Sequence, residues 1–432
     1  MVIEVSQLGG QGGARKTRAL VLHPDIRSQE RRRSAESALE EAVALALALP
    51  GIEIVGAAIV TLPKAQPGRL FGKGKLQELK ARIEEDEVEL VLVDGPVTPV
   101  QQRNLERDWN VKLLDRTGLI LEIFADRART REGVLQVELA ALSYQRTRLV
   151  RAWTHLERQR GGLGFVGGPG ETQIEADRRA IDEQMTRLRR QLEKVTRTRE
   201  LHRAARRRVP FPIVALVGYT NAGKSTLFNR LTGAEVMAKD MLFATLDPTM
   251  RAVRLSTGAQ VILSDTVGFI SDLPTQLVAA FRATLEEVLE ADLICHVRDI
   301  SHPETEEQAE DVEAILTSLG VAEETPLIEV WNKFDRLDPE ARATLQAQAE
   351  RRENVLALSA LTGEGMEGLV ARIGAVLDAD RQRREIVLGF DEGRRRAWLY
   401  EQGVVESERE AENGYRLAVN WTPRQAQLFR DI

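Results

Sequence analysis

The apolar positions along the first 115 residues alternate between two patterns. Short apolar runs predict strands at 18–22, 53–61, 88–93 and 111–115. Between these runs, helical spacing of the apolar residues predicts helices over 30–49, 73–85 and 99–108. Strands that alternate with helices indicate a small α/β domain, which we expect over residues 18–131. The glycine-rich residues 1–17 are expected to form a flexible N-terminus.

Residues 132–209 follow a helical period on both sides of a glycine-rich segment. The two apolar stripes consist of Leu135, Leu139, Leu142, Leu149, Trp153 and Leu156, and of Ile174, Ile181, Met185, Leu188, Leu192 and Val195. This pattern predicts an antiparallel helical hairpin whose stripes face each other or the α/β domain. The loop 161–170 between the helices holds six glycines and one proline. It is longer than the roughly three to five residues that a connector needs, which favours a functional loop over plain flexibility.

A third region, from 210 to 380, repeats the alternation of strands and helices. Strands are predicted at 213–217, 251–256, 260–264, 292–298, 326–331 and 354–358, and helices at 224–232, 275–290, 304–319, 339–352 and 366–379. Such a unit places its ligands on the loops at the strand ends. A charged linker is expected at 381–385 and a small α/β module at 386–432. The fold class is therefore expected to be α/β and multidomain.

Composition limits where the protein acts and what it contacts. The single cysteine, Cys295, excludes an internal disulfide and a cysteine-based metal cluster. No uncharged apolar run approaches the ~20 residues of a membrane span, so we expect no membrane span. The lone cysteine favours a cytoplasmic location, and we expect a monomer. The net charge of −6 argues against a nucleic-acid partner, but residues 146–208 carry 17 arginines and lysines against eight acidic residues, a local net charge of +9.

The basic hairpin is thus a candidate RNA-binding surface, although a basic stretch is also typical of a solvated helix face. A flexible, backbone-rich tip flanked by arginines suits insertion into structured RNA. The candidate RNA contacts are Arg158, Arg160, Gly161, Gly162, Gly164, Gly167 and Gly168.

One segment carries the clearest chemical signal, because it matches the phosphate-binding loop G-x-x-x-x-G-K-[ST] at every fixed position. It consists of Gly218, Tyr219, Thr220, Asn221, Ala222, Gly223, Lys224 and Ser225. Backbone N–H groups of such a loop turn toward a phosphate, and the following helix adds its positive end. Lys224 would reach the β- and γ-phosphates, and the Ser225 hydroxyl would bind Mg²⁺. The alternative is a glycine-rich turn that binds nothing.

A second motif assigns the base. Asn332, Lys333 and Asp335 follow the strand predicted at 326–331. The carboxylate of Asp335 would accept hydrogen bonds from N1–H and the 2-amino group of guanine, which adenine lacks. Asn332 would brace the loop, and the Lys333 stem would lie over the base. A backbone N–H of the segment Ser359, Ala360 and Leu361 would bind the guanine oxygen.

Two segments are candidates to sense the γ-phosphate. The first, Asp265, Thr266, Val267 and Gly268, ends a predicted strand; Asp265 would hold Mg²⁺, usually through water, and the Gly268 N–H would contact the phosphate. The second contains Phe243, Ala244, Thr245, Leu246 and Asp247, and its threonine would close over Mg²⁺ in an order–disorder switch. Thr245 is our first choice for this threonine and Thr249 the second. The catalytic candidates are Lys224, Thr245 and Gly268.

These motifs resemble those of the Ras-like GTPases, with one departure. Phe269 follows Gly268, where many such enzymes carry a glutamine that orients water. A phenyl ring cannot do this, so intrinsic hydrolysis should be slow and depend on a partner.

The resemblance narrows to one family. Residues 218–229, 243–249 and 265–270, together with 115–117, 121–124, 127–132 and 168–173, are similar to HflX over about residues 15–380. The resemblance implies a GTPase that binds the large (50S) ribosomal subunit and splits stalled ribosomes under stress. It also implies RNA contacts through the N-terminal half, with the hairpin loop reaching toward the peptidyl-transferase region, and hydrolysis stimulated by the large subunit.

Two other interpretations stay open. One is a signalling switch that binds protein effectors, in which the hairpin is only a solvated coiled coil. The other is an added ATP-driven RNA-remodelling activity of the N-terminal domain, which would use Lys73 or Lys75. The resemblance implies ATP binding outside the GTPase domain, and the short Gly-Lys-Gly-Lys run at 72–75 is what the sequence offers for it.

Overall fold

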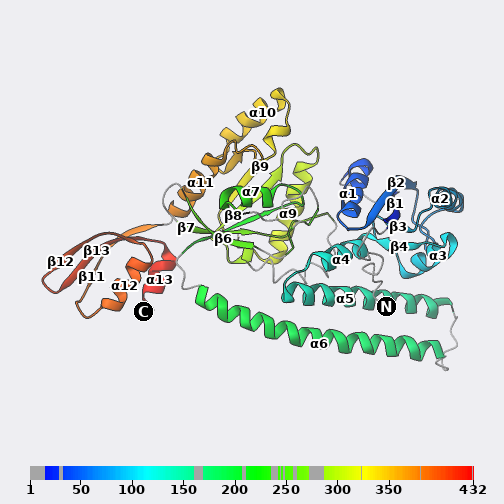
Figure 1. The fold of residues 1–432 in the computed structure, drawn as a ribbon, viewed down its shortest axis with the longest axis horizontal. Helices are drawn as coiled ribbons and strands as arrows, with labels where there is room; N and C mark the ends of the chain where they lie inside the picture. Colours follow the sequence, from blue (N-terminus) through cyan, green and yellow to red (C-terminus); the bar gives the residue numbers. More distant parts are fainter. Residues whose placement is uncertain are drawn as a thin grey trace.

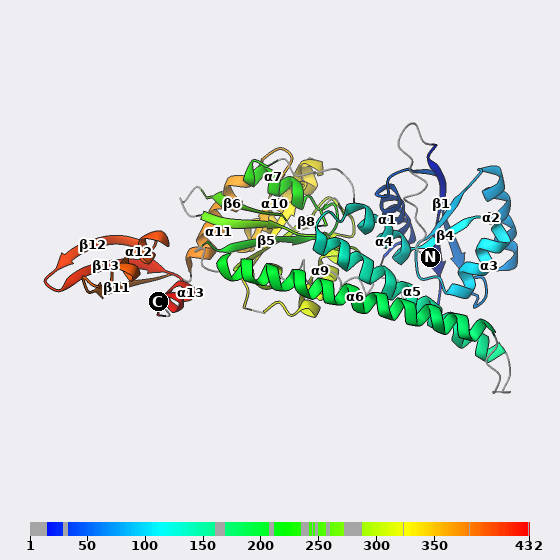
Figure 2. The same cartoon turned by 60° about the horizontal axis from the view of Figure 1, so that its bottom comes forward.

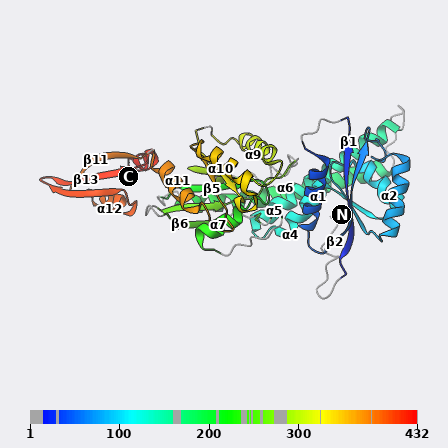
Figure 3. The ribbon, with the colours of Figure 1, turned by 90° about the horizontal axis from the view of Figure 1, so that it is seen from above.

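A computed structural model of the chain describes most of the 432 residues. The described residues are 15–28, 33–159, 169–206, 211–234, 242–243, 245–246, 249–255, 260–271, 287–322, 324–379, 381–430 and 432. The side chains of 150–174, 198–206 and 423–424 are not described. Three sheets lie in a row, with the N-terminal sheet at one end and the C-terminal sheet at the other (Figure 1). The view from above shows the same order (Figure 3).

The N-terminal domain is built on a parallel four-stranded sheet of order β2-β1-β3-β4. Its elements are β1 (Thr17–Ile26), α1 (Ala35–Leu47), β2 (Ile52–Leu62), α2 (Lys73–Glu85), β3 (Leu90–Val93), α3 (Pro99–Trp109) and β4 (Lys112–Asp115). One sheet face packs on α2 and α3, around Phe71 and Trp109. The other face packs on α1. The predicted alternation of strands and helices is confirmed in this domain.

Helix α4 (Arg116–Arg127) follows β4 directly and was not expected from the sequence. Asp115 caps it, because its side chain accepts a hydrogen bond of 2.8 Å from the Gly118 N–H. Asp115 also accepts from Tyr144 (2.6 Å) and Arg148 (3.1 Å) on the next helix. This buried carboxylate therefore fixes both helices to the N-terminal sheet.

The hairpin consists of α5 (Arg131–Gln159) and α6 (Pro169–Arg206), which run side by side along the N-terminal domain and beneath the central sheet (Figure 2). The expectation that the stripes face each other is confirmed near the base of the hairpin, since Leu135 and Leu142 pack against Met185 and Leu188. The side chains of Trp153, Leu156 and Ile174 are not among those described. Arg146, which lies on the same seam, forms an ion pair of 2.8 Å with Asp182. The predicted loop 161–170 is two residues too long, because α6 already begins at Pro169, a residue favoured at the first helical position.

The central domain is a six-stranded sheet of order β10-β9-β8-β5-β7-β6, parallel except for β6. Its described elements are β5 (Ile213–Gly218), α7 (Lys224–Thr232), β6 (Thr249–Arg254), β7 (Gln260–Asp265), β8 (Leu293–Asp299), α9 (Thr305–Leu319), β9 (Leu327–Asn332), the 3₁₀ turn η2 (Phe334–Arg336), α10 (Pro339–Glu350), β10 (Val355–Ala357) and α11 (Met366–Ala379). The predicted helix 275–290 lies mostly outside the described residues. Apolar residues on α7 and α11 cover one face of the sheet, and residues on α9 cover the other.

The C-terminal module is a three-stranded antiparallel sheet of order β11-β13-β12. It comprises β11 (Gln382–Leu388), α12 (Gly393–Glu401), β12 (Val405–Ala411), β13 (Gly414–Trp421) and α13 (Pro423–Arg430). The predicted charged linker 381–385 is wrong, because β11 begins at Gln382 and pairs along its length with β13. The prediction failed because this strand is polar. The first four residues of β11 are all exposed, as expected at a sheet edge, so they show no apolar pattern.

Candidate nucleotide site

The sequence motifs of the central domain meet at one edge of its sheet. The phosphate-binding loop follows β5, Asp265 ends β7, Asn332 ends β9, and Ser359 comes soon after β10. All four strands are parallel, so their carboxyl ends share this edge. The chain order reverses at β5, which lies between β7 and β8. A crevice outside the carboxyl ends at such a reversal is where α/β sheets bind ligands.

Two glycines of the loop are required by close backbone approach. Gly218 has φ of +149°, and a Cβ there would lie 2.1 Å from the carbonyl oxygen of Val297. Gly223 has φ of +96°, and a Cβ there would lie 2.2 Å from Nδ2 of Asn332. Neither conformation suits a residue with a side chain. The phosphate loop therefore packs closely against Val297 of β8 and against Asn332.

Lys224 is buried at the start of α7. Its Nζ donates hydrogen bonds to the carbonyl oxygens of Gly218 (3.1 Å) and Tyr219 (2.8 Å), which hold the ammonium group over the loop. Burial lowers the pKa of Lys224 to about 8, although the nearby Asp265 works in the opposite direction. A bound phosphate would place a negative charge beside this buried ammonium group and would stabilise its charged form.

Three oxygen-bearing side chains converge beside the lysine. The hydroxyls of Ser225 and Thr245 are 2.9 Å apart, and both donate to Oδ2 of Asp265, at 2.8 and 2.9 Å. The other carboxylate oxygen, Oδ1, is buried without a hydrogen-bond partner among the described residues. Burial raises the pKa of Asp265, against the effects of Lys224 and the two hydroxyls. Oxygen ligands with an unsatisfied carboxylate fit a hard divalent cation such as Mg²⁺.

The two candidate switch threonines occupy different environments. Thr245 is buried in this oxygen cluster, whereas Thr249 begins β6 and lies opposite Asp265 in the β6–β7 ladder. The neighbours Ala244 and Asp247 lie outside the described residues. The geometry therefore brings Thr245, and not Thr249, to the hydroxyl of Ser225.

The base-recognition residues form a second cluster. Nδ2 of Asn332 donates to the Ala222 carbonyl (2.8 Å), and its Oδ1 accepts from the Ala360 N–H (2.9 Å). One side chain thus links the phosphate loop to the segment after β10. Oδ1 of Asp335 accepts from the Ser359 hydroxyl at 2.5 Å. Leu361 is exposed at the same edge.

Lys333 completes this cluster. It has φ of +64°, which turns the chain into η2, and its Nζ forms a 2.7 Å ion pair with Asp299 at the end of β8. A left-handed conformation at a residue with a long side chain is unusual and marks a tightly determined turn.

The segment after β7 lies directly on the phosphate loop. The Thr220 N–H donates to the Phe269 carbonyl (2.6 Å), and the Phe269 N–H donates to the Gly218 carbonyl (3.1 Å). Gly268 lies so close to the phosphate loop that a Cβ at this position would be 2.9 Å from Cα of Thr220 and 3.0 Å from Nζ of Lys224. Thr266 is buried and donates to the Leu216 carbonyl (2.6 Å), and Val267 is also buried.

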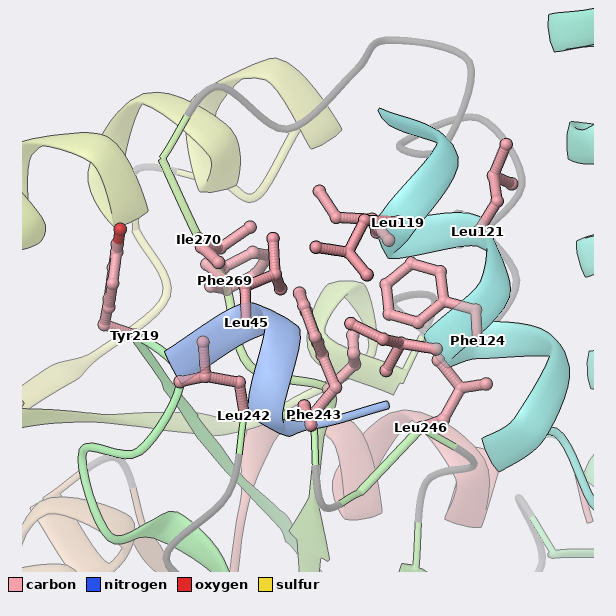
Figure 4. Packing of buried hydrophobic residues seen from close by; sticks show 14 of the residues in the cluster. Leu45, Leu119, Leu121, Phe124, Tyr219, Leu242, Phe243, Leu246, Phe269 and Ile270 are labelled. Carbon is pink, nitrogen blue, oxygen red and sulfur yellow. The ribbon is translucent and has the colours of Figure 1, made fainter. Parts of the chain in front are cut away.

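The side chain of Phe269 is only 1% exposed and belongs to an apolar cluster shared with the N-terminal domain. In that cluster it lies beside Ile270 and near Leu45 of α1 (Figure 4). The residue at the position of the usual water-orienting glutamine therefore contributes to the contact between two domains.

Sequence reasoning missed a buried polar network that joins the two domains beside the phosphate loop. The Tyr219 hydroxyl donates to Glu41 of α1 and accepts from the Ser271 N–H (2.7 Å). Arg116 of α4 binds Glu41 and donates to the Ser271 carbonyl and hydroxyl, both at 3.0 Å. Arg33 adds ion pairs with Glu41 (2.9 Å) and Glu304 (2.7 Å). The Tyr219 side chain thus contacts the N-terminal domain.

The charges of this network compensate one another. Burial alone would oppose ionisation of Glu41, but Arg116, Arg33 and the hydroxyls of Ser271 and Tyr219 outweigh it and lower the pKa of Glu41 to about 2. Burial together with Glu41 raises the pKa of Tyr219 above its usual range. The glutamate is therefore ionised and the tyrosine is a hydrogen-bond donor.

The RNA-contact candidates are only partly covered by the structure. Arg158 lies on α5, but its side chain is not among those described, and Arg160, Gly161, Gly162, Gly164, Gly167 and Gly168 lie outside the described residues. Within the described part of the chain, no helix is both long and apolar enough to cross a membrane.

Known families match the chain in four consecutive parts. These are "GTP-binding GTPase N-terminal" over residues 36–125, "GTP-binding GTPase Middle Region" over 127–206, "50S ribosome-binding GTPase" over 213–333 and "HflX C-terminal domain" over 344–430.

Curated relatives match over most of their length. GTPase HflX of Magnetococcus marinus is 53% identical over 373 residues, which cover 86% of this chain and 85% of the relative. GTPase HflX of Escherichia coli is 43% identical, with 84% and 85% covered. Putative GTP-binding protein 6 of Xenopus laevis is 36% identical, with 90% and 74% covered. With these matches and a complete set of nucleotide motifs on an α/β sheet, the chain belongs to the HflX family of GTPases, which bind and hydrolyse GTP.

Proposed function

We propose that this GTPase binds the large ribosomal subunit and uses its GTP-bound state to split or rescue stalled ribosomes, with hydrolysis stimulated by the ribosome. The observation that carries the proposal is the position of Phe269. An apolar ring buried between two domains cannot orient water, so an external partner must complete the catalytic site. The family description "50S ribosome-binding GTPase" for residues 213–333 and the basic hairpin support a ribosomal partner.

The residues of the site divide the chemistry between them. Lys224 would bind the β- and γ-phosphates and stabilise the charge that develops during transfer. Ser225 and Thr245 would hold Mg²⁺ directly, and Asp265 through water. When bound, this ion would neutralise charge on the phosphate oxygens. The Gly268 N–H would contact the γ-phosphate, because Gly268 already lies against Lys224.

Guanine would be recognised by Asp335, whose carboxylate is held by Ser359. Asn332 would keep this carboxylate in register with the phosphate loop, since it bonds both segments. The backbone of 360–361 remains the candidate for the guanine oxygen.

The central test measures GTP turnover by the full chain with and without purified 50S subunits. We expect slow turnover alone and an increase of at least about tenfold with the subunits, as partners that complete a GTPase site raise kcat strongly. The 30S subunit provides the matched control. A 50S preparation that leaves the rate unchanged would contradict the proposal.

A second prediction concerns the hairpin tip. Replacing residues 161–170 with a short linker should abolish co-sedimentation with ribosomes in the presence of a GTP analogue, while GTP binding is retained. Ribosome binding by the unmodified chain should weaken as salt rises, because phosphate contacts release counterions. Undiminished, salt-insensitive binding by the loop variant would instead favour the signalling-switch interpretation with a protein effector.

A further inference from the structure

We propose that helix α4 of the N-terminal domain is a seat for the switch threonine: Phe124 acts as a positioning residue that holds Thr245 at the metal-binding cluster by packing on Phe243. Docking of the N-terminal domain and binding of GTP would then favour each other. The inference goes beyond the proposed function and rests on it at one point, the role of Thr245.

The first support is the contact itself. The rings of Phe124 and Phe243 are 4.6 Å apart, centroid to centroid, and meet edge to face at 81°. Both are almost fully buried, at 0% and 2% exposure. This geometry is among the favourable arrangements for aromatic pairs. Figure 4 shows Phe243 and Leu246 directed toward Phe124 and Leu119 of α4.

Apolar anchors lie on both sides of the threonine. Leu242 and Phe243 precede Thr245, Leu246 follows it, and all three belong to the core cluster that includes α4. A polar hydroxyl between apolar anchors has little freedom to move away unless the anchors leave the cluster. The Thr245 hydroxyl in turn lies 2.9 Å from both Ser225 and Asp265.

The backbone of Phe243 gives a second, independent sign. Its φ is +54°, a left-handed conformation that costs a bulky residue free energy. Such a conformation persists only where the surroundings over-determine it, as often at switches. Here the described surroundings that bury the ring come partly from α4 and Leu45 of α1, so the N-terminal domain holds the strained residue in place.

The polar network fixes the seat relative to the phosphate loop. Arg116 lies in the first turn of α4 and binds Ser271, while Glu41 connects Arg116 to Tyr219 in the phosphate loop. Helix α4 therefore contacts two segments of the central domain, Phe243 through Phe124 and Ser271 through Arg116. A seat held this rigidly favours one position of Thr245.

The coupling between the seat and the nucleotide follows from linkage. GTP, unlike GDP, carries the γ-phosphate that draws a switch threonine inward. If the seat also favours the inward position, it raises affinity for GTP more than for GDP, and bound GTP strengthens domain docking by the same factor.

The test compares affinities for the GTP analogue GDPNP and for GDP, with Mg²⁺, in the full chain. We expect Phe124→Leu and Phe243→Leu each to lower the ratio of GDPNP to GDP affinity by about tenfold, the scale of one lost aromatic contact. The double variant should be no worse than either single one, because both remove the same contact. Phe71→Leu is the matched control. Phe71 is 1% exposed and packs on the face of the N-terminal sheet that is turned away from α4. This substitution should reduce stability without changing the affinity ratio.

Hydrogen exchange of the unmodified chain provides a readout that needs no folded variant. Amides of 119–124 should exchange more slowly with GDPNP than with GDP. An unchanged affinity ratio in Phe124→Leu, or equal exchange with both nucleotides, would overturn the inference, provided that Thr245→Ala lowers the ratio. If Thr245→Ala leaves the ratio unchanged, the role assigned to Thr245 fails, and the inference fails with it.

Discussion

Replacing Asp335 with asparagine is expected to change the preferred nucleotide from GTP to XTP, with at least about a thousandfold change in relative affinity. The Asp335 carboxylate would accept two hydrogen bonds from guanine. An asparagine amide would place a donor against one of those guanine donors, whereas xanthine carries a carbonyl oxygen where guanine carries its 2-amino group. The fold should persist, because the asparagine oxygen can still accept the bond from Ser359.

The measurement is competition between GTP and XTP for the full chain. Asp338→Asn is a close control. Asp338 lies three residues further on, caps α10 through the Glu340 and Ala341 N–H groups, and can be replaced by asparagine, an equally good cap. A variant at 335 that still prefers GTP would refute guanine recognition by this carboxylate.

Removing the charge of Lys224 is expected to reduce GTP hydrolysis by at least about a hundredfold, with or without 50S subunits. A single preorganised donor to transition-state charge contributes on this scale. Lys224 is such a donor: it is buried, and a bound phosphate would favour its charged form. We do not expect Lys224→Ala to unfold, because burial already disfavours the charged lysine in the free protein. Turnover at saturating GTP, together with a melting curve, checks both statements.

Lys73→Ala and Lys75→Ala are the controls for this result. Both lysines lie on α2 of the N-terminal domain, so GTP turnover should not change. These variants also test the alternative of an ATP-driven activity in the N-terminal domain. ATP turnover that survives in Lys224→Ala but is lost in the α2 variants would indicate a separate ATP site. Full GTP turnover in Lys224→Ala would contradict the assignment of the phosphate loop.

The sequence predicted the central domain well because its chemistry lies in short contiguous motifs at strand ends. The phosphate-binding loop that contains Lys224 follows β5, and Asn332 ends β9, so the parallel arrangement alone brings them to one edge. The hairpin was equally predictable, because its helical period extends over many turns.

Helix α4 was missed for the opposite reason. Its segment 119–124 is almost continuously apolar, and all but Glu122 are buried. A short apolar run shows no period that separates a strand from a helix. Burial on several sides, by the N-terminal sheet and by the central domain, explains why the pattern carries no polar face.

By itself, the sequence determined the nucleotide class, the base and the absence of a water-orienting residue at position 269. Only the tertiary structure decided that the Phe269 ring lies between the domains, that Thr245 and not Thr249 meets Ser225, and that Tyr219 contacts Glu41. Tyr219 and Glu41 are 178 positions apart in the chain. Local periodicity reports which residues share a helix or strand face, whereas contacts between distant segments depend on how complete domains pack.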